Sequence, residues 1–267
     1  MIKVCEQFYS LQGEGAHIGT PSYFIRLAGC PFTCSFCDSK FTWSGNVYNS
    51  TIDTETDMRQ FFMSHIYNKP FSHIVFTGGE PLQEDNLQTL FDFIRFIDRY
   101  STHEIPYMFT IETTLIPNTD NIKSNRILNV IEDMYKKYIT TANIHFSISP
   151  KFNMCAYKKY PTLNKNDIFS YYSLNGTTQL RIDSYFKNSY YKFVYTNETV
   201  NDILFFISHH VPSFFKNNIF VMPVTSIPYD KDEYNNACVE VAEFCKREGI
   251  RYSSRLHVDL WGLMKGV

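Results

Sequence analysis

With 267 residues and 44% hydrophobic side chains, the chain can bury a sizeable core and is expected to be globular. Its formal net charge of −2 gives no support to a nucleic-acid-binding module, which would normally have a basic surface. No apolar run approaches the roughly 20 residues that cross a bilayer, and the first residues lack the apolar core of a signal peptide, so we expect a cytoplasmic protein with no membrane partner.

Strand and helix patterns alternate along most of the chain. Runs of branched and aromatic side chains predict strands, and apolar residues spaced three or four apart predict helices. The predicted strands cover residues 22–27, 73–77, 107–112, 144–149, 191–195 and 219–223. The predicted helices cover residues 53–68, 85–99, 120–138, 199–209 and 231–248.

Two of these helices have specific sequence support. Helix 85–99 has one continuous apolar face, formed by Leu87, Leu90, Phe91, Ile94 and Ile97. Helix 231–248 starts with Asp230 and Glu233 in the spacing of a capping box and ends before Gly249.

The alternation predicts an α/β fold. Strands that alternate with helices are joined by crossovers and run parallel. About six repeats are too few for a closed eight-fold barrel, so an open, partial TIM-like barrel is expected. Residues 152–190 have little periodicity and predict a long excursion. Because no linker or repeat is visible, a single domain over residues 1–267 is expected.

Three cysteines occur within eight residues: Cys30, Cys34 and Cys37, in the spacing C-x3-C-x2-C. A structural zinc site needs four ligands, usually on two knuckles, and no second knuckle lies nearby. Three thiolates suit a [4Fe–4S] cluster that keeps one iron free for another ligand. The alternative is three incidental buried thiols, which is unusual for cysteines this dense.

Two further motifs follow predicted strands. In the segment 77–81, Gly78 and Gly79 allow close backbone approach to a zwitterion, and Glu80 can accept a hydrogen bond from its ammonium group. On its own the segment could be an ordinary turn, but its position after a three-cysteine loop favours a cofactor site. The segment 149–151 ends the fourth strand, and its alternative is a strand stop followed by a solvated lysine.

The cysteine spacing, with the aromatic Phe36 before the last cysteine, resembles the radical S-adenosylmethionine superfamily. Further segments resemble the 7-carboxy-7-deazaguanine synthases, which make the precursor of queuosine and related 7-deazaguanines. They are residues 10–15, 19–21, 24–30, 255–262 and 265–267.

This resemblance implies a modified (β/α)6 half-barrel of the radical S-adenosylmethionine type. It implies a lyase that converts 6-carboxy-5,6,7,8-tetrahydropterin to 7-carboxy-7-deazaguanine with loss of ammonia. The implied cofactors are a [4Fe–4S] cluster on Cys30, Cys34 and Cys37, S-adenosylmethionine, and Mg2+. A reductant such as flavodoxin and a homodimer are also implied.

The resemblance also assigns individual residues. Those of the S-adenosylmethionine site are Phe36, Cys37, Asp38, Gly79, Glu80, Ser149, Pro150, Lys151, Met222, Pro223, Val224 and Thr225. Those of the pterin site are Leu11, Gln12, Gly13, Glu14, Arg26, Thr77, His257 and the C-terminal carboxylate of Val267.

The residue types fit these assignments. An amide such as that of Gln12 can read the hydrogen-bonding edge of a pterin, and the guanidinium of Arg26 can bind its carboxylate. The alternatives are a plain surface turn around Gln12 and a rim salt bridge for Arg26. For His257 the alternative is a core histidine.

Three departures from the family pattern stand out. Ser39 replaces the threonine whose hydroxyl binds Mg2+, and since a serine keeps a hard oxygen ligand, Mg2+ binding is expected to survive in weaker form. Thr113 and Thr114 occupy a segment that usually includes Asn-Gly, and the residues before Arg255 lack a frequent proline. These two departures concern turn geometry.

Two other functions remain open from the sequence. A glycyl-radical-enzyme activase shares the cysteine spacing, although the segment 12–21 and the C-terminal motif speak against it. A non-catalytic iron–sulfur or zinc protein would leave the segments 77–81 and 149–151 without a role.

Overall fold

The computed structural model of the chain describes residues 1–102, 106–114, 143–151, 155–157, 189–210, 213–225 and 228–266. The strands are β1 (Ile2–Leu11), β2 (Pro21–Leu27), β3 (Phe32–Cys34), β4 (Ser50–Ile52), β5 (His73–Gly78), β6 (Met108–Thr113), β7 (Asn143–Ile148), β8 (Cys155–Tyr157), β9 (Tyr190–Tyr195), β10 (Ile219–Pro223) and β11 (Arg251–Tyr252). The helices are α1 (Glu55–His65), α2 (Glu84–Asp98), α6 (Val200–His210), α7 (Lys231–Glu248) and α8 (Leu256–Trp261), with 3-10 turns η1 (Gly15–His17), η2 (Lys40–Thr42) and η3 (Ser213–Asn218).

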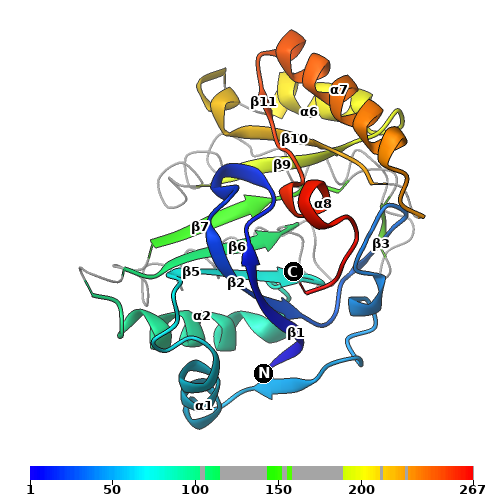
Figure 1. Cartoon of the computed structure of the whole chain (residues 1–267). Coiled ribbons are helices and arrows are strands. Elements are labelled where there is room, and N and C mark those ends of the chain that lie inside the picture. Colours follow the sequence, from blue (N-terminus) through cyan, green and yellow to red (C-terminus); the bar gives the residue numbers. More distant parts are fainter. Residues whose placement is uncertain are drawn as a thin grey trace.

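One large sheet has the strand order β11-β10-β9-β7-β6-β5-β2-β1-β4 (Figure 1). The run from β2 through β5, β6, β7 and β9 to β10 is parallel throughout. These six strands follow one another in chain order, and α1, α2 and α6 lie in the crossovers that the structure describes. The predicted α/β fold with six parallel strands is therefore confirmed. The carboxyl ends of all six strands meet at one edge of the sheet.

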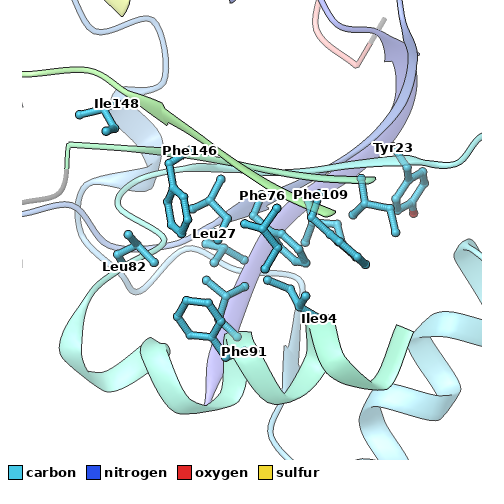
Figure 2. Packing of buried hydrophobic residues seen from close by; sticks show 14 of the residues in the cluster. Tyr23, Leu27, Phe76, Leu82, Phe91, Ile94, Phe109, Phe146 and Ile148 are labelled. Carbon is cyan, nitrogen blue, oxygen red and sulfur yellow. The ribbon is translucent and has the colours of Figure 1, made fainter. Parts of the chain in front are cut away.

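The two faces of the sheet differ in polarity because side chains alternate along each strand. One face packs on the helices, and Figure 2 shows Phe76, Phe109 and Phe146 of neighbouring strands on the side that faces α2, from which Phe91 and Ile94 point toward the sheet. The alternate positions form the polar face of the sheet, which carries the site. Its polar side chains include Ser22, Arg26, His73, Thr77, Thr110, Glu112 and Lys192.

The predicted helices are largely confirmed, and their caps explain their limits. The side chain of Asp230 accepts hydrogen bonds from the backbone N–H groups of Asp232 and Glu233, and α7 ends at Gly249 with a left-handed φ of 66°. These features fix both ends as predicted. α1 is shorter than the predicted 53–68 at both ends. A capping box between Thr54 and Asp57 starts it later, and Asn68, with a left-handed φ of 55°, lies beyond its end.

Six strands and helices of the described residues were not predicted: β1, β3, β4, β8, β11 and α8. The two-residue β11 pairs parallel with β10. β1 and β4 extend the sheet with antiparallel pairing, and α8 turns the C-terminal motif into a short helix. β3, inside the cysteine loop, pairs with β8, so the start of the 152–190 excursion buttresses the cysteine loop. The predicted helix over 120–138 and the rest of the excursion up to residue 188 lie outside the described residues. None of the helices in the described part has the length and apolar character that a membrane crossing requires.

Three histidines lie together at the start of the parallel strands, on the polar face. His73 is buried, and its ring nitrogens lie 2.7 Å from Ser22 Oγ and 2.8 Å from Thr110 Oγ1. His17 Nε2 lies 3.2 Å from His145 Nδ1, and the rings of His17 and His73 are 5.3 Å apart. Burial, aided by the neighbouring His17 and His145, lowers the pKa of His73 to about 3.

This low pKa predicts a loss of stability in mild acid. The unfolded chain takes up a proton below the ordinary pKa of 6.5, whereas the folded protein leaves His73 neutral down to about 3. Stability from this group is therefore complete above 6.5 and falls by about 1.4 kcal/mol per pH unit below it. His73→Gln keeps two hydrogen-bonding ends but cannot titrate. Urea unfolding at pH 7 and pH 5 should show an extra loss of about 2 kcal/mol in the wild type relative to this variant; equal losses would refute the assignment.

Candidate active site

The cysteine loop follows β2 at the carboxyl edge of the sheet. The cysteines Cys30, Cys34 and Cys37 are thiols, and a tight turn brings Cys37 N to 3.2 Å from Cys34 O. Burial raises the pKa of Cys30 to about 12, while a hydrogen bond from the Phe32 backbone opposes the rise. The backbone of Ser39 donates in the same way to the sulfur of Cys37. Backbone donors to sulfur are a common feature around iron–sulfur clusters. The described residues hold no group of three or more His, Cys, Asp or Glu side chains already arranged around one metal position, so a cluster would have to draw the three thiols together.

The glycine turn after β5 packs directly against the beginning of this loop. Gly79 N donates to Leu27 O at 2.9 Å, and Glu80 N donates to Gly29 O at 2.7 Å. A Cβ atom on Gly79 would lie 1.8 Å from Gly29 O, which is impossible without displacement of the backbone. Glycine is therefore required at position 79 because two main chains touch there, one residue before Cys30.

The carboxylate of Glu80 is fully buried and bonded within the protein. Oε1 accepts from Leu82 N and Thr113 Oγ1, and Oε2 accepts from Thr114 N and Oγ1. These four donors match the roughly four lone-pair positions of a carboxylate. Burial raises the pKa of Glu80, and the donated hydrogen bonds oppose that rise. The two threonines that replace Asn-Gly thus fix the glycine turn to the end of β6.

The ends of β7 and β10 contribute to the same edge. Ser149 N donates to Thr113 O at 2.8 Å, and Lys151 Nζ donates to Ser149 Oγ at 2.7 Å. The ammonium of Lys151 lies 5.8 Å from the ring centre of Phe36, so the segment 149–151 reaches the cysteine loop. Pro150, Met222 and Pro223 are buried, and Val224 is half-buried.

One pocket of about 470 Å3 opens beside the cysteine loop. It is lined by Ser35, Phe36, Cys37, Asp38, Lys40, Phe41, Thr225 and Lys265. Four of the residues predicted for S-adenosylmethionine therefore share one pocket: Phe36, Cys37, Asp38 and Thr225. Gly79, Glu80, the segment 149–151 and the segment 222–224 do not line it.

The loop after β1 brings predicted pterin-site residues onto the polar face. Gln12 is buried, its Oε1 accepts from Glu14 N at 3.2 Å, and its Nε2 lies 3.5 Å from Glu112 Oε1. Thr77 Oγ1 donates to the other oxygen of Glu112 at 2.7 Å. Glu112 therefore links two predicted substrate residues, Gln12 and Thr77, that are far apart in the chain. Leu11 ends β1 opposite Pro21.

Glu14 lies at the centre of a buried ion network. Its carboxylate binds Lys192 Nζ at 2.6 Å and Arg255 Nε at 2.9 Å, and Lys192 also binds Glu112 Oε1 at 3.2 Å. Burial alone would raise the pKa of Glu14, but the charges of Lys192 and Arg255 outweigh it and hold that pKa well below its usual range. Both oxygens of the Glu14 carboxylate are thus already bound by side chains of the protein.

Arg26 is placed beside the predicted Mg2+ ligand. Its Nε donates to Glu6 Oε1 at 2.7 Å, and its Nη1 donates to Ser39 Oγ at 3.0 Å. Ser39 Oγ in turn donates to Asp38 Oδ1 at 3.0 Å. The salt bridge considered as an alternative for Arg26 is present, and it leaves the guanidinium next to the cysteine loop.

The C-terminal motif, residues 255–262, packs against the loop after β1. Leu256 N donates to Gly13 O at 2.9 Å, and His257 Nε2 lies 3.9 Å from Glu14 Oε1. A Cβ atom on Gly13 would lie 2.0 Å from His257 Nδ1, so glycine is needed for this approach. His257 is half-buried at the site rather than in the core. Val267 lies outside the described residues.

Sequence reasoning missed three charged residues of the site: Glu112, Lys192 and Arg255. A usable signal existed for two of them, because Glu112 and Lys192 each interrupt a predicted apolar strand on the side that alternates away from the core. Arg255 was recognised only as part of a motif, and its partners lie far away in the chain.

Comparisons with known proteins show what this chain is similar to. The family described as "4Fe-4S single cluster domain" matches residues 11–152. The 7-carboxy-7-deazaguanine synthase of Pyrobaculum aerophilum is 26% identical over 273 residues, which cover 99% of this chain and 97% of that protein. The protein of the same name from Buchnera aphidicola subsp. Schizaphis graminum is 31% identical over 187 residues, 61% of this chain and 73% of that protein.

A solved structure supports the fold. The crystal structure of QueE from Escherichia coli matches with a TM-score of 0.57 at 20% identity, over 96% of this chain and 94% of that chain. The similarity therefore concerns the fold of nearly the whole chain.

Proposed function

The chain belongs to the 7-carboxy-7-deazaguanine synthase family, and we propose that it converts 6-carboxy-5,6,7,8-tetrahydropterin to 7-carboxy-7-deazaguanine with loss of ammonia. The observation that carries this proposal is the meeting of two sites at one sheet edge. A three-thiol loop packed against a glycine turn lies next to a buried polar surface that includes Gln12, Arg26 and Thr77.

The residues fit the implied cofactors. Cys30, Cys34 and Cys37 would hold a [4Fe–4S] cluster, and the pocket of Phe36, Cys37, Asp38 and Thr225 would take part of S-adenosylmethionine. When bound, these cofactors supply the one-electron chemistry that starts the reaction. Glu80 would act by fixing the glycine turn, because its oxygens already accept four hydrogen bonds.

The polar face would bind and orient the pterin. The amide of Gln12 and the carboxylate of Glu112 offer a donor and an acceptor to the pterin edge, and Thr77 holds Glu112 in place. Arg26 donates to Ser39 beside the cysteine loop and would receive the substrate carboxylate. Because Gln12 and Thr77 are buried, these contacts would form away from water, where they are strongest.

Metal analysis tests the cofactor assignment. Anaerobic reconstitution should give about four irons per chain in the wild type and in Cys245→Ala, a buried cysteine of α7, and a clear loss of iron in Cys34→Ala. Zinc without iron in the wild type would instead favour the structural metal protein.

The hydroxyl of Ser39 predicts that the rate of product formation depends on Mg2+. Its hydroxyl and the Asp38 carboxylate are 3.0 Å apart and supply hard oxygens, while Arg26 must turn from Ser39 to the substrate carboxylate. We expect wild-type product formation to fall when Mg2+ is removed, Ser39→Thr to need less Mg2+ for half-maximal rate, and Ser39→Ala to lose the response. A wild-type rate that is independent of Mg2+ would contradict this assignment.

Three finer features also belong to the proposal and rest on the sequence resemblance. The enzyme would receive electrons from a flavodoxin-like reductant, form a homodimer and work in the cytoplasm. Sedimentation equilibrium tests the dimer, and replacing a chemical reductant by reduced flavodoxin in the product assay tests the donor.

A further inference from the structure

Arg255 contacts three separate segments of the site through its three guanidinium nitrogens. Nε donates to Glu14 Oε1 at 2.9 Å, Nη2 donates to Asp38 Oδ2 at 2.6 Å, and Nη1 donates to Thr225 Oγ1. The residue is 6% exposed and precedes α8, which lies over the sheet near the loop after β1 (Figure 1).

Each partner belongs to a different part of the proposed enzyme. Glu14 is on the loop that carries Gln12, Asp38 follows the last cysteine of the cysteine loop, and Thr225 follows β10 in the pocket beside it. A guanidinium is planar and holds its N–H groups in a fixed fork, so its three partners cannot move independently of one another.

We propose that Arg255 is a positioning residue that fixes the substrate loop, residues 12–15, against the cysteine loop and the residues after β10. The proposal rests on the function proposed above. Reacting groups must approach to roughly 3–3.5 Å, and a displacement of about 1 Å can cost about 100-fold in rate. Arg255 thus keeps the pterin within reach of the cofactor without touching either of them.

Arg255→Lys tests this role while it preserves the buried positive charge. A lysine has one ammonium group and cannot reach Glu14, Asp38 and Thr225 together. Arg251→Lys is the matched control, because Arg251 is exposed on β11 and lies over the ring of Phe220 at 4.4 Å. Both variants are reconstituted anaerobically as holoenzymes, and iron content and thermal unfolding show whether each is intact.

Two readouts follow. The first is the amount of 5′-deoxyadenosine released per product formed, which we expect to rise about tenfold or more in Arg255→Lys and to stay unchanged in Arg251→Lys. The second is hydrogen exchange of residues 12–18, which does not depend on activity and should be at least several-fold faster in Arg255→Lys alone.

The outcomes separate this proposal from the proposed function. Unchanged exchange in an intact Arg255→Lys protein overturns the positioning role. So does faster exchange with unchanged coupling of deoxyadenosine to product. A wild type that forms no 7-carboxy-7-deazaguanine refutes the proposed function and with it the catalytic part of this inference, whereas the exchange result still decides whether Arg255 holds the loop.

Discussion

Replacing Gly79 by alanine is expected to lower product formation by about 100-fold, because a displacement of about 1 Å in a reacting site has this effect. The new Cβ would lie 1.8 Å from Gly29 O, and the contact is with backbone that cannot rotate away. The turn must therefore move off the residue that precedes Cys30, which breaks the hydrogen bond from Glu80 N to Gly29 O. The measurement is the initial rate of 7-carboxy-7-deazaguanine formation by reconstituted enzyme.

Gly249→Ala provides the control for this change. Gly249 ends α7 with a φ of 66° and has open space around its Cα, so alanine there costs about 1 kcal/mol of backbone strain and touches no part of the site. Its rate should equal that of the wild type. A Gly79→Ala enzyme with the wild-type rate would show that the contact between the turn and the cysteine loop is not required.

Replacing Lys192 by methionine is expected to destabilise the protein by about 3–5 kcal/mol, the usual cost of removing one partner of a buried ion pair. Lys192 is 5% exposed and lies between the carboxylates of Glu14 and Glu112. Without its charge, Glu14 keeps its ion pair with Arg255, whereas Glu112 loses the ion pair that Lys192 provides and faces Glu14 without that cation between them. Urea unfolding of the anaerobic protein at pH 7 measures the effect.

Lys246→Met is the matched control for Lys192→Met. Lys246 pairs with Glu243 on the exposed surface of α7, and exposed pairs contribute at most about 1 kcal/mol. The second change Glu112→Gln should restore part of the stability lost in Lys192→Met, since it removes one of the two facing charges. Equal effects at positions 192 and 246 would mean that the network around Glu14 does not stabilise the fold.

The parallel part of the fold could be predicted because its signals are local. Strand β5 and helix α2 carry their own apolar patterns, and Asp230 and Gly249 mark the ends of α7 by their residue types. β1 could not be predicted in this way, because polar and apolar residues are mixed along it and its buried residues do not alternate regularly with its exposed ones. Its place depends on antiparallel pairing with β2, a tertiary property.

The candidate site likewise has a part that could be predicted from local motifs and a part that could not. The cysteine loop and the glycine turn are compact motifs, so the sequence was sufficient to find them and to expect them at one sheet edge. The ion network is different, because Glu14 forms its ion pairs with Lys192 and Arg255, which are far from it in the sequence. Spacing and periodicity say nothing about such distant pairs, and only the folded sheet shows that these charges neutralise one another.

One protein surface is expected to serve two ligands. In the proposed function, the glycine turn and the pocket of Thr225 would serve the cofactor, whereas Gln12 and Thr77 would serve the substrate. Arg255 and Glu80 would touch neither ligand and would hold in place the residues that do. Substitution of either residue should therefore lower the yield of product per cofactor cleaved more than it lowers the amount of cofactor bound.

One anaerobic assay decides whether the protein catalyses the proposed reaction. Iron-reconstituted protein is supplied with S-adenosylmethionine, a reductant, Mg2+ and 6-carboxy-5,6,7,8-tetrahydropterin, and 7-carboxy-7-deazaguanine is measured by mass spectrometry. We expect product from the wild type and none from Cys34→Ala. Slow release of 5′-deoxyadenosine by the wild type without product would contradict the proposed substrate and favour a radical enzyme that acts on another molecule, such as a glycyl-radical-enzyme activase.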